Sequence, residues 1–437
     1  MRNKNFITLG FASVSVAIML LSVNLFGNST KDLDSDKEIS RLEALSKFTK
    51  VIGIVEQYNV DEISIEDLMD KALKGMMSNL DAHSNFLTQK DYKNLKVQTD
   101  GEFGGLGITV GMRDGALTVI SPIEGTPADK AGLKAEDIIL KINDASTLGM
   151  TIDEAVSIMR GKVGDPIDLT IVRKGELKPL HIHIIRDIIS IQSVYTKTIS
   201  KDLLYVRVTS FDKKVVKDVK SAIKKHKENT KAIILDLRNN PGGLLDQAVG
   251  LVDLFVDSGD IVSQKGRKES DKQVYSASSS NTITNVPVVV LVNGGSASAS
   301  EIVSGALQDH RRAVIVGTKT FGKGSVQVVL PITKTEAIKL TIARYYLPSG
   351  RTIQAVGVKP DIEVFPGEYK THKNDFSIKE ADLKKHLEKE LAKVDNKKPK
   401  KEKKEDKKDI ITLEMLNKDI QLKEAVDILK ALVIIKG

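Results

Sequence analysis

The sequence contains no cysteine and no tryptophan, and only 4% of its 437 residues are aromatic. Without cysteine the chain cannot form a disulfide, a thiolate zinc site, an iron–sulfur cluster or a cysteine nucleophile. The scarcity of aromatic side chains disfavours a protein that binds nucleic acid by stacking its bases. Apolar residues make up 41% of the chain and charged residues 28%, as in ordinary globular proteins. At this length we expect two or three folded units.

The net charge of +8 is concentrated near the two ends of the chain. Residues 397–408 contain eight lysines and three acidic residues, so they carry five of the eight charges. Arg2 and Lys4 carry two more, which leaves the remainder nearly neutral and gives no indication of a nucleic-acid partner. We interpret 397–408 as a solvated linker; contact with acidic lipid or another protein is the alternative.

The first 29 residues have the pattern of a targeting segment. Arg2 and Lys4 precede an uncharged, largely apolar run at 6–26. At about 1.5 Å per helical residue this run is long enough to cross a bilayer. Small residues at 27–29 offer a cleavage site. We therefore expect 1–29 to be a signal peptide or a membrane anchor, with the rest of the chain exported in either case.

Two helices are expected in the helical region at 35–96. Apolar residues recur every three or four positions from Ile39 to Val55, which predicts an amphipathic helix. Ser64, with Asp67 three residues later, predicts the start of a second helix that ends near Asn79. These helices could pack against the same chain or form a dimer interface.

Short strands and glycine turns follow at 97–186. A glycine-rich loop at 104–108 precedes a strand at 117–120, a helix at 151–160 and a strand at 168–173, and this order resembles a PDZ domain. Successive backbone N–H groups in such a loop can bind a carboxylate, and an exposed strand edge can bind an extended peptide. The resemblance assigns that role to three residues, namely Leu106, Gly107 and Ile108.

Buried strands alternate with glycine turns and helices from 191 to about 363. Apolar runs at 232–237, 286–292 and 313–316 are typical of strands covered on both faces. Strand, turn and helix units in series predict an α/β fold whose reacting groups lie on the turns at the carboxyl ends of the strands.

One of these turns carries Ser296, Ser298 and Ser300 directly before a helix. Serine at this position is often only a helix cap. The functional alternative is a nucleophile whose oxyanion would face the free N–H groups of the helix.

A serine nucleophile needs a base, and two kinds are available. Of the seven histidines, only His83 and His310 are candidates from their positions. The other candidate is Lys323, between two glycines in 320–327. To act near neutral pH, a lysine needs a pKa about 3 units below its usual value, roughly 4 kcal/mol, and therefore an apolar pocket.

A possible nucleotide site is excluded. Residues 317–323 match the start of a phosphate-binding loop, but Gly324 stands where serine or threonine would bind magnesium. A strand at 326–330 is expected next, whereas the motif requires a helix.

Taken together, residues 39–363 resemble the carboxyl-terminal processing proteases. The similarity is carried by the segments 80–84 (LDAHS), 235–243 (LDLRNNPGG), 295–302 (GSASASEI) and 320–324 (TFGKG), together with the PDZ elements. It implies an α/β core of the crotonase and Clp-protease type with an inserted PDZ domain, an N-terminal helical region and a C-terminal helical tail. It divides the chain into 1–29, 35–96, 97–186, 187–366 and 367–437.

The resemblance also implies roles for individual residues. Ser298 would be the nucleophile, Lys323 the general base, and Gln327 the residue that orients the lysine. The oxyanion would be bound by the N–H groups of Ala299 and of either Gly242 or Gly243.

The family implies a serine endopeptidase without metal or cofactor that cleaves exported proteins near free, apolar C-termini. The PDZ domain would bind the substrate tail and gate activity. We expect a homo-oligomer, such as a dimer, with an adaptor protein as a further candidate partner. The expected location is the periplasm, or the outer face of the bacterial inner membrane with attachment through the N-terminus. The alternative is a catalytically silent PDZ scaffold.

Two features depart from the family pattern or lie beyond it. Ala82 stands where many members have proline, within the helical region. A helical stripe of apolar residues lies beyond the matched part of the chain and predicts a docking or oligomerisation helix, formed by Leu422, Val426, Leu429 and Val433.

Overall fold

The structure is a computed structural model that describes residues 35–200, 202–369 and 410–436. The predicted leader at 1–29 and the basic segment at 397–408 lie outside the described residues. The chain divides between Ala82 and His83 into two compact units, each of which is described by itself. None of the described helices combines the length and the apolar character of a bilayer-spanning helix.

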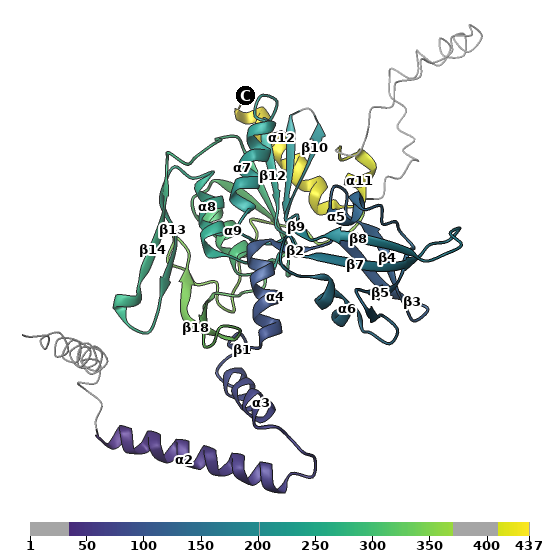
Figure 1. Ribbon diagram of the computed structural model, residues 1–437. Helices are drawn as coiled ribbons and strands as arrows, with labels where there is room; N and C mark the ends of the chain where they lie inside the picture. The colour runs from purple at the N-terminus through teal and green to yellow at the C-terminus, as the bar shows by residue number, and fades with distance from the viewer. Residues whose placement is uncertain (1–34, 201, 370–409, 437) are drawn as a thin grey trace, which may run out of the picture. The chain divides into compact units, whose positions relative to one another are not determined.

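The first unit contains two helices, α2 (Ser35–Tyr58) and α3 (Ile65–Ser78) (Figure 1). The predicted cap of α3 is confirmed, because the Ser64 hydroxyl accepts a hydrogen bond from the Asp67 N–H at 3.1 Å. Leu42 and Leu45 of α2 are exposed to solvent in this structure. A role of this unit in dimerisation stays a prediction.

The second unit begins with β1 (Asn85–Leu87) and α4 (Gln89–Asp100), and then enters the predicted PDZ region. Here six strands form an antiparallel sheet in the order β3-β4-β5-β7-β8, with β6 beside β5. The strands are β3 (Ile108–Arg113), β4 (Ala116–Pro122), β5 (Ile138–Ile142), β6 (Ala145–Ser146), β7 (Pro166–Val172) and β8 (Leu180–Ile185).

Two helices belong to this sheet, α5 (Pro127–Lys130) and α6 (Ile152–Met159). The predicted bounds of α6 are confirmed at its two caps, Thr151 and Arg160. Thr151 and Glu154 form a reciprocal capping box, with N–H to side-chain oxygen distances of 2.8 and 3.2 Å. Local capping chemistry therefore sets where this helix begins.

A two-stranded ribbon connects this region to the rest of the unit. It pairs β2 (Glu102–Gly105) with β9 (Asp187–Ser190). Beside it, the ammonium group of Lys214 donates to the carbonyl oxygens of Gly101 at 2.7 Å and of Ile191 at 3.1 Å. One lysine thus contacts the chain both where it enters and where it leaves the ribbon.

The remainder of the unit contains two sheets. The first has the order β10-β11-β12-β15-β16-β19 and is parallel from β11 onward. Its strands are β10 (Val194–Ser200), β11 (Leu203–Val208), β12 (Ala232–Asp236), β15 (Val288–Val292), β16 (Ala313–Gly317) and β19 (Ile362–Glu363). The second sheet pairs β1 and β17 (Ser325–Pro331) with β18 (Ala337–Tyr346), and continues through β13 (Ser258–Lys265) and β14 (Gln273–Ser278).

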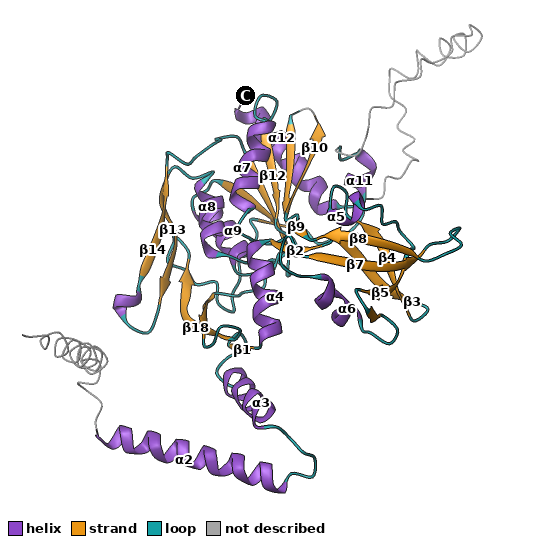
Figure 2. Ribbon diagram, in the orientation of Figure 1, coloured by secondary structure: helices purple, strands orange, loops and turns teal. Residues whose placement is uncertain are grey.

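Helices cover both faces of the parallel sheet (Figure 2). Side chains alternate between the faces of a strand, so Ile233 and Leu235 of β12 pack with α7 (Val215–Lys225), α8 (Leu245–Asp253) and α9 (Ala299–Asp309). Ala232 and Ile234 face the other side, in one cluster with residues of the C-terminal helices α11 (Leu413–Asn417) and α12 (Ile420–Lys436). Burial on both faces explains the uninterrupted apolar runs of these strands.

The predicted apolar stripe of the final segment docks on the chain's own sheet. Leu422, Val426 and Leu429 of α12 are buried there, with Val433 partly buried at the edge of the same cluster. The fold class predicted from the sequence is therefore confirmed: an α/β core, a separate small sheet domain, and helices toward both ends.

Candidate active site

Three loops lie at one edge of the parallel sheet. They follow the neighbouring strands β12, β15 and β16 and comprise residues 237–244, 293–298 and 318–324. Hydrogen bonds join them, because Ala297 N–H donates to the Asn240 carbonyl at 3.0 Å and Phe321 N–H donates to the Ser296 carbonyl at 3.1 Å. This edge is where α/β sheets commonly bind their ligands.

The three serines of the middle loop have different environments. Ser296 is fully buried, and its hydroxyl donates to the Leu237 carbonyl at 2.8 Å. Ser300 is also fully buried and donates to the Asn240 carbonyl at 2.9 Å. Ser298 is half-buried, and its hydroxyl donates to no acceptor among the described residues. Ser296 and Ser300 therefore connect the loops, while the Ser298 hydroxyl remains available for chemistry.

The backbone of Ser298 is in an uncommon conformation. Its φ is 55° and its ψ is −110°, a combination that costs a residue with a Cβ about 1–3 kcal/mol. Gly242, at φ 100°, makes room for this turn, because a Cβ added to Gly242 would lie 2.9 Å from the Ser298 Cβ and 3.0 Å from the Ala299 nitrogen. A tight turn between a strand and a helix presents a serine hydroxyl in this way.

The carboxylate of Glu301 connects the serine turn to the lysine loop. It is fully buried and accepts four hydrogen bonds. Oε2 accepts the N–H groups of Ser298 and Lys323, each at 2.8 Å. Oε1 accepts the Thr320 hydroxyl at 2.6 Å and the Gly322 N–H at 2.7 Å. Because Oε2 accepts both backbone N–H groups, two hydrogen bonds to one oxygen connect the backbone of Ser298 to that of Lys323.

Lys323 is half-buried at the end of its loop. Burial lowers the pKa of its ammonium group, and the nearby charge of Lys339 lowers it further, against an opposing effect of Glu301. The direction is the one that a lysine base requires. The Lys323 ammonium and the Ser298 hydroxyl are not hydrogen-bonded to each other in the structure.

Gln327 lies on β17, where the register shifts between Val326 and Gln327. Its Nε2 donates to the Ser325 hydroxyl at 2.7 Å and to the Thr341 hydroxyl at 3.4 Å. The described residues include no donor to its Oε1. That oxygen is consequently the atom of Gln327 that can accept a bond from a lysine.

The candidate oxyanion donors differ in their availability. The Gly242 N–H donates to the Asn240 side chain at 2.9 Å. Within the described residues, the N–H groups of Gly243 and Ala299 have no acceptor. The geometry therefore favours Gly243 over Gly242 as the partner of Ala299, a choice that the sequence left open.

The two candidate histidines have other surroundings. His310 caps the C-terminal end of α9, and its Nε2 lies 2.7 Å from the Asp260 carbonyl oxygen. Because α9 has 11 residues, at about 1.5 Å each, His310 is a whole helix length away from Ser298. His83 precedes β1, where the adjoining Ser84 hydroxyl accepts the Thr341 N–H at 3.1 Å. Ser84 of the sequence motif thus contacts Thr341, the neighbour of Gln327, a proximity that the sequence did not reveal.

The predicted peptide-binding loop lies before the edge strand β3. The carbonyl of Leu106 accepts the Ala128 N–H at 2.9 Å, and that of Gly107 accepts the Ile123 N–H at 2.8 Å. Gly107 has a φ of 78°, which favours glycine. The N–H groups of Leu106 and Gly107 have no acceptor in the part of the chain that the structure describes, as a carboxylate-binding loop requires.

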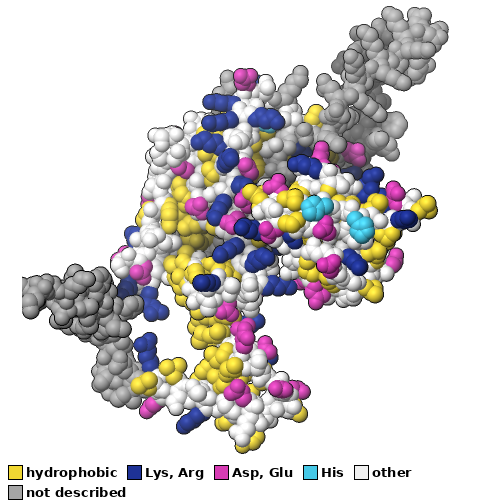
Figure 3. Space-filling model, in the orientation of Figure 1, with side chains coloured by type: hydrophobic (Ala, Val, Ile, Leu, Met, Phe, Trp, Pro, Cys, Tyr) yellow, Lys and Arg dark blue, Asp and Glu magenta, His cyan; other side chains and the backbone are white. Residues whose placement is uncertain are grey.

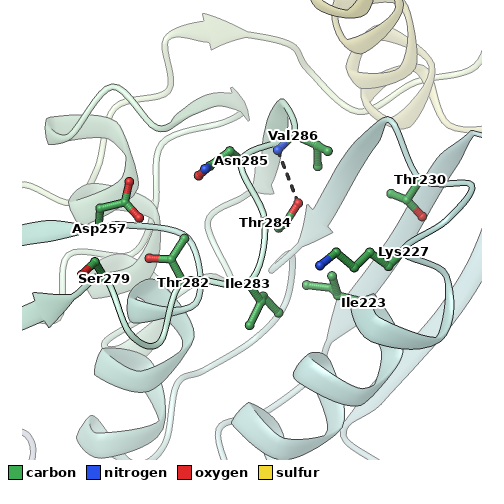
Figure 4. A pocket seen from close by; sticks show the side chains of 10 residues that line it. All are labelled: Ile223, Lys227, Thr230, Asp257, Ser279, Thr282, Ile283, Thr284, Asn285 and Val286. Atoms are coloured by element: carbon green, nitrogen blue, oxygen red, sulfur yellow. Dashed lines mark hydrogen bonds between the residues drawn. The ribbon is translucent and has the colours of Figure 1, made fainter.

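Other surface features lie elsewhere. A cavity of about 450 Å³ is lined by Ile223, Lys227 and Thr284 among others (Figure 4), and it adjoins the start of β15, at the opposite end of that strand from Ser298. On the face drawn in Figure 3, basic and acidic side chains are interspersed. Among the described residues, no group of three or more histidine and acidic side chains is arranged to bind a metal ion.

Comparison with known proteins identifies the family. Residues 202–364 match the model of peptidase family S41, and residues 118–173 match that of the PDZ domain. A carboxy-terminal-processing protease of Bartonella bacilliformis is 42% identical over 385 residues, which are 86% of this chain and 86% of that protein. The chain belongs to the carboxy-terminal processing proteases of family S41. It is a serine protease, and the predicted family, fold and enzyme class are confirmed.

Two further similarities are more distant. The carboxy-terminal processing protease CtpA of Bacillus subtilis is 35% identical over 365 residues, covering 82% of this chain and 78% of that protein. The solved structure of a photosystem II D1 C-terminal processing protease is 28% identical, covers 71% of this chain and 85% of that chain, and superposes with a TM-score of 0.43.

Proposed function

We propose that this protease cleaves proteins near their C-termini with Ser298 as nucleophile and Lys323 as general base. The observation that carries the proposal is the contrast among the three serines. Ser296 and Ser300 donate their hydroxyl protons to backbone carbonyls, whereas Ser298 alone keeps a half-buried, uncommitted hydroxyl at the start of α9.

The reaction begins with neutral Lys323, whose lowered pKa favours this form. Its amine must come within about 2.6–3.2 Å of the Ser298 hydroxyl. Glu301 already fixes both backbones, so we expect the approach to come from the lysine side chain and not from the loops. The amine takes the hydroxyl proton as the serine oxygen attacks the scissile carbonyl carbon, and the Gln327 Oε1 accepts a bond that orients the lysine.

The tetrahedral intermediate carries its negative charge on the former carbonyl oxygen. The free N–H groups of Ala299 and Gly243 bind that oxygen. The lysine then returns its proton to the leaving amine, which departs and leaves an ester on Ser298. Water, deprotonated by Lys323, attacks this ester and releases the new C-terminus of the substrate.

The PDZ region would select the substrate. Its free N–H groups at Leu106 and Gly107 would bind the terminal carboxylate, while Ile108 begins the edge strand β3 along which an extended apolar tail can pair. Binding there would gate cleavage. Export of the protease, attachment through its N-terminus, dimerisation and an adaptor protein remain part of the proposal from the sequence.

Four purified proteins test the catalytic residues: the wild type and the variants Ser298→Ala, Lys323→Ala and Lys319→Ala. Lys319 is an exposed lysine of the same loop and serves as the matched control. Each protein is incubated with an unstructured protein substrate without metal or nucleotide, and fragments are identified by mass spectrometry. We expect cleavage by the wild type and Lys319→Ala only. Full turnover by Ser298→Ala or Lys323→Ala would refute the proposed dyad.

A separate comparison tests tail recognition. Two peptides of identical sequence, one with a free C-terminal carboxylate and one amidated, are supplied as substrates. Amidation removes the charge that the loop at Leu106 would bind, so we expect weaker cleavage of the amidated peptide. Equal cleavage of both peptides would contradict this part of the proposal without affecting the dyad.

A further inference from the structure

The side chain of Arg238, in the active-site loop 237–244, is almost completely enclosed, with 12% of its area exposed. It follows β12 by two residues and uses all three guanidinium nitrogens. Nε and Nη2 donate to the buried carboxylate of Asp236, with the shortest distance 2.7 Å. Nη1 and Nη2 donate to Asp419 at 2.9 and 2.8 Å, and Nη1 also donates to the Gln421 side chain at 3.1 Å.

Asp419 is 181 residues away from Arg238 in the sequence and directly precedes α12. Its two oxygens bind two nitrogens of the guanidinium group, and Oδ1 also accepts the Leu422 N–H at 3.1 Å. Burial raises the pKa of Asp419, but the hydrogen bond and charge of Arg238 outweigh this effect and keep the pKa below the usual value of an aspartate. The carboxylate is therefore charged at neutral pH.

The helix that follows Asp419 is fixed to the parallel sheet. Leu422, Val426 and Leu429 are buried against the face that also carries Ile234. Gln421 is 3% exposed and donates to the Val364 carbonyl at 2.7 Å. The Asp419 carboxylate is thus presented to Arg238 from a rigid element rather than from a loose tail.

A short chain of contacts leads from Arg238 to the nucleophile. Asn240 follows two residues later, and its carbonyl accepts the Ala297 N–H at 3.0 Å and the Ser300 hydroxyl at 2.9 Å, on either side of Ser298. The Asn240 side chain accepts the Gly242 N–H. A shift of Arg238 would consequently displace both the serine turn and the loop that carries Gly243.

We propose that Asp419 is a positioning residue of the active site, through which the C-terminal helix fixes Arg238 and with it the loop 237–244. The proposal rests on Ser298 being the nucleophile. A buried ion pair adds little net stability compared with apolar packing, so the expected consequence of this pair is the geometry of the loop. The segment beyond the S41 match would then be required for turnover, although it supplies no group that touches the substrate.

Asp419→Asn tests the proposal, because it preserves the shape of the side chain but removes its charge and one of its two acceptors for Arg238. Asp427→Asn is the matched control, since it also breaks an ion pair of α12, with Lys423 at 2.7 Å, but that pair is remote from Arg238. Full-length proteins are assayed for kcat and KM on one peptide, well below the unfolding temperature of each variant.

We expect Asp419→Asn to lower kcat by roughly 10-fold to 100-fold, the effect of a small misplacement of reacting groups, with KM unchanged. Asp427→Asn should keep the wild-type kcat. Arg238→Lys should reproduce the loss, and the double variant should lose no more than either single variant, because both act through one contact. Asp419→Glu should restore part of kcat.

Gln421→Leu covers the case in which Asp419→Asn does not fold. It removes the acceptor at 3.1 Å and the bond to the Val364 carbonyl but leaves both Asp419 oxygens on Arg238, and it should give a smaller decrease in kcat. If folded Asp419→Asn and Gln421→Leu both keep the kcat of Asp427→Asn, the inference is overturned. Ser298→Ala in the same assay separates the two proposals. If Ser298→Ala is inactive and Asp419→Asn is fully active, only the positioning role of Asp419 is refuted. If Ser298→Ala is active, the proposed dyad is refuted.

Discussion

The Glu301→Gln variant should separate the structural and electrostatic roles of the carboxylate that joins the two catalytic loops. The less costly orientation of the new amide keeps its oxygen on the Ser298 and Lys323 N–H groups. Its nitrogen then donates to the Thr320 hydroxyl, which in the wild type donates to Glu301 and must turn its own proton elsewhere. The Gly322 N–H then loses its acceptor at 2.7 Å. One buried, unpaired N–H costs about 1–3 kcal/mol, so the free energy of unfolding should fall by about this amount. The opposite orientation leaves two N–H groups unpaired and costs roughly twice as much.

The same substitution changes the charge near Lys323. The negative charge of Glu301 raises the pKa of Lys323, so its removal should lower that pKa further. A base acts only when neutral, and the rising limb of kcat/KM against pH should therefore move to lower pH. Glu228→Gln, at an exposed position after α7, is the control. Denaturant unfolding followed by circular dichroism measures stability, since the chain has no tryptophan. Unchanged stability together with an unmoved pH profile would refute the central place of Glu301.

Three further predictions concern single positions. Lys339→Gln removes a charge that lowers the pKa of Lys323, so the rising limb of the pH–activity profile should move to higher pH, opposite to Glu301→Gln. A shift to lower pH would contradict the direction in which Lys339 affects this pKa. Gly242→Ala forces a Cβ to 2.8 Å from the Ala297 carbonyl oxygen at a φ of 100° and should abolish peptide cleavage. Gly294→Ala, whose added Cβ would lie 4.0 Å from the Lys319 carbonyl oxygen, should remain active, and equal activities would contradict the tight turn. Leu429→Ala on α12 should lower the free energy of unfolding by about 2–5 kcal/mol, and a loss below 1 kcal/mol in denaturant titrations would show that the helix is not docked.

Local patterns predicted the secondary structure of the second unit well. The strand expected at 232–237 is β12, and the helix expected at 151–160 is α6 with its two caps. Both depend on neighbouring residues: an apolar run covered on two faces, and a threonine with a glutamate three positions later. The family and the enzyme class followed from the serine and lysine motifs, whose combination is specific.

The internal connections of the site could not be predicted in the same way. Ser296, Ser298 and Ser300 look equivalent in residue type and spacing, and only the family resemblance singled out Ser298. Their physical difference lies in contacts with the carbonyl groups of Leu237 and Asn240, about 60 residues earlier. The contact between Arg238 and Asp419 joins residues 181 positions apart and leaves no periodic signal. The apolar stripe of α12 was visible, but the surface that covers it depends on the assembled sheet.

Trapping the covalent intermediate tests the central claim most directly. The wild type and Ser298→Ala are mixed with a peptide aryl ester, quenched in acid within one turnover, and digested for mass spectrometry. The account predicts an acyl group on Ser298 of the wild type, none on Ser296 or Ser300, and none on the variant. An acyl group on another serine, or turnover by Ser298→Ala, would contradict it.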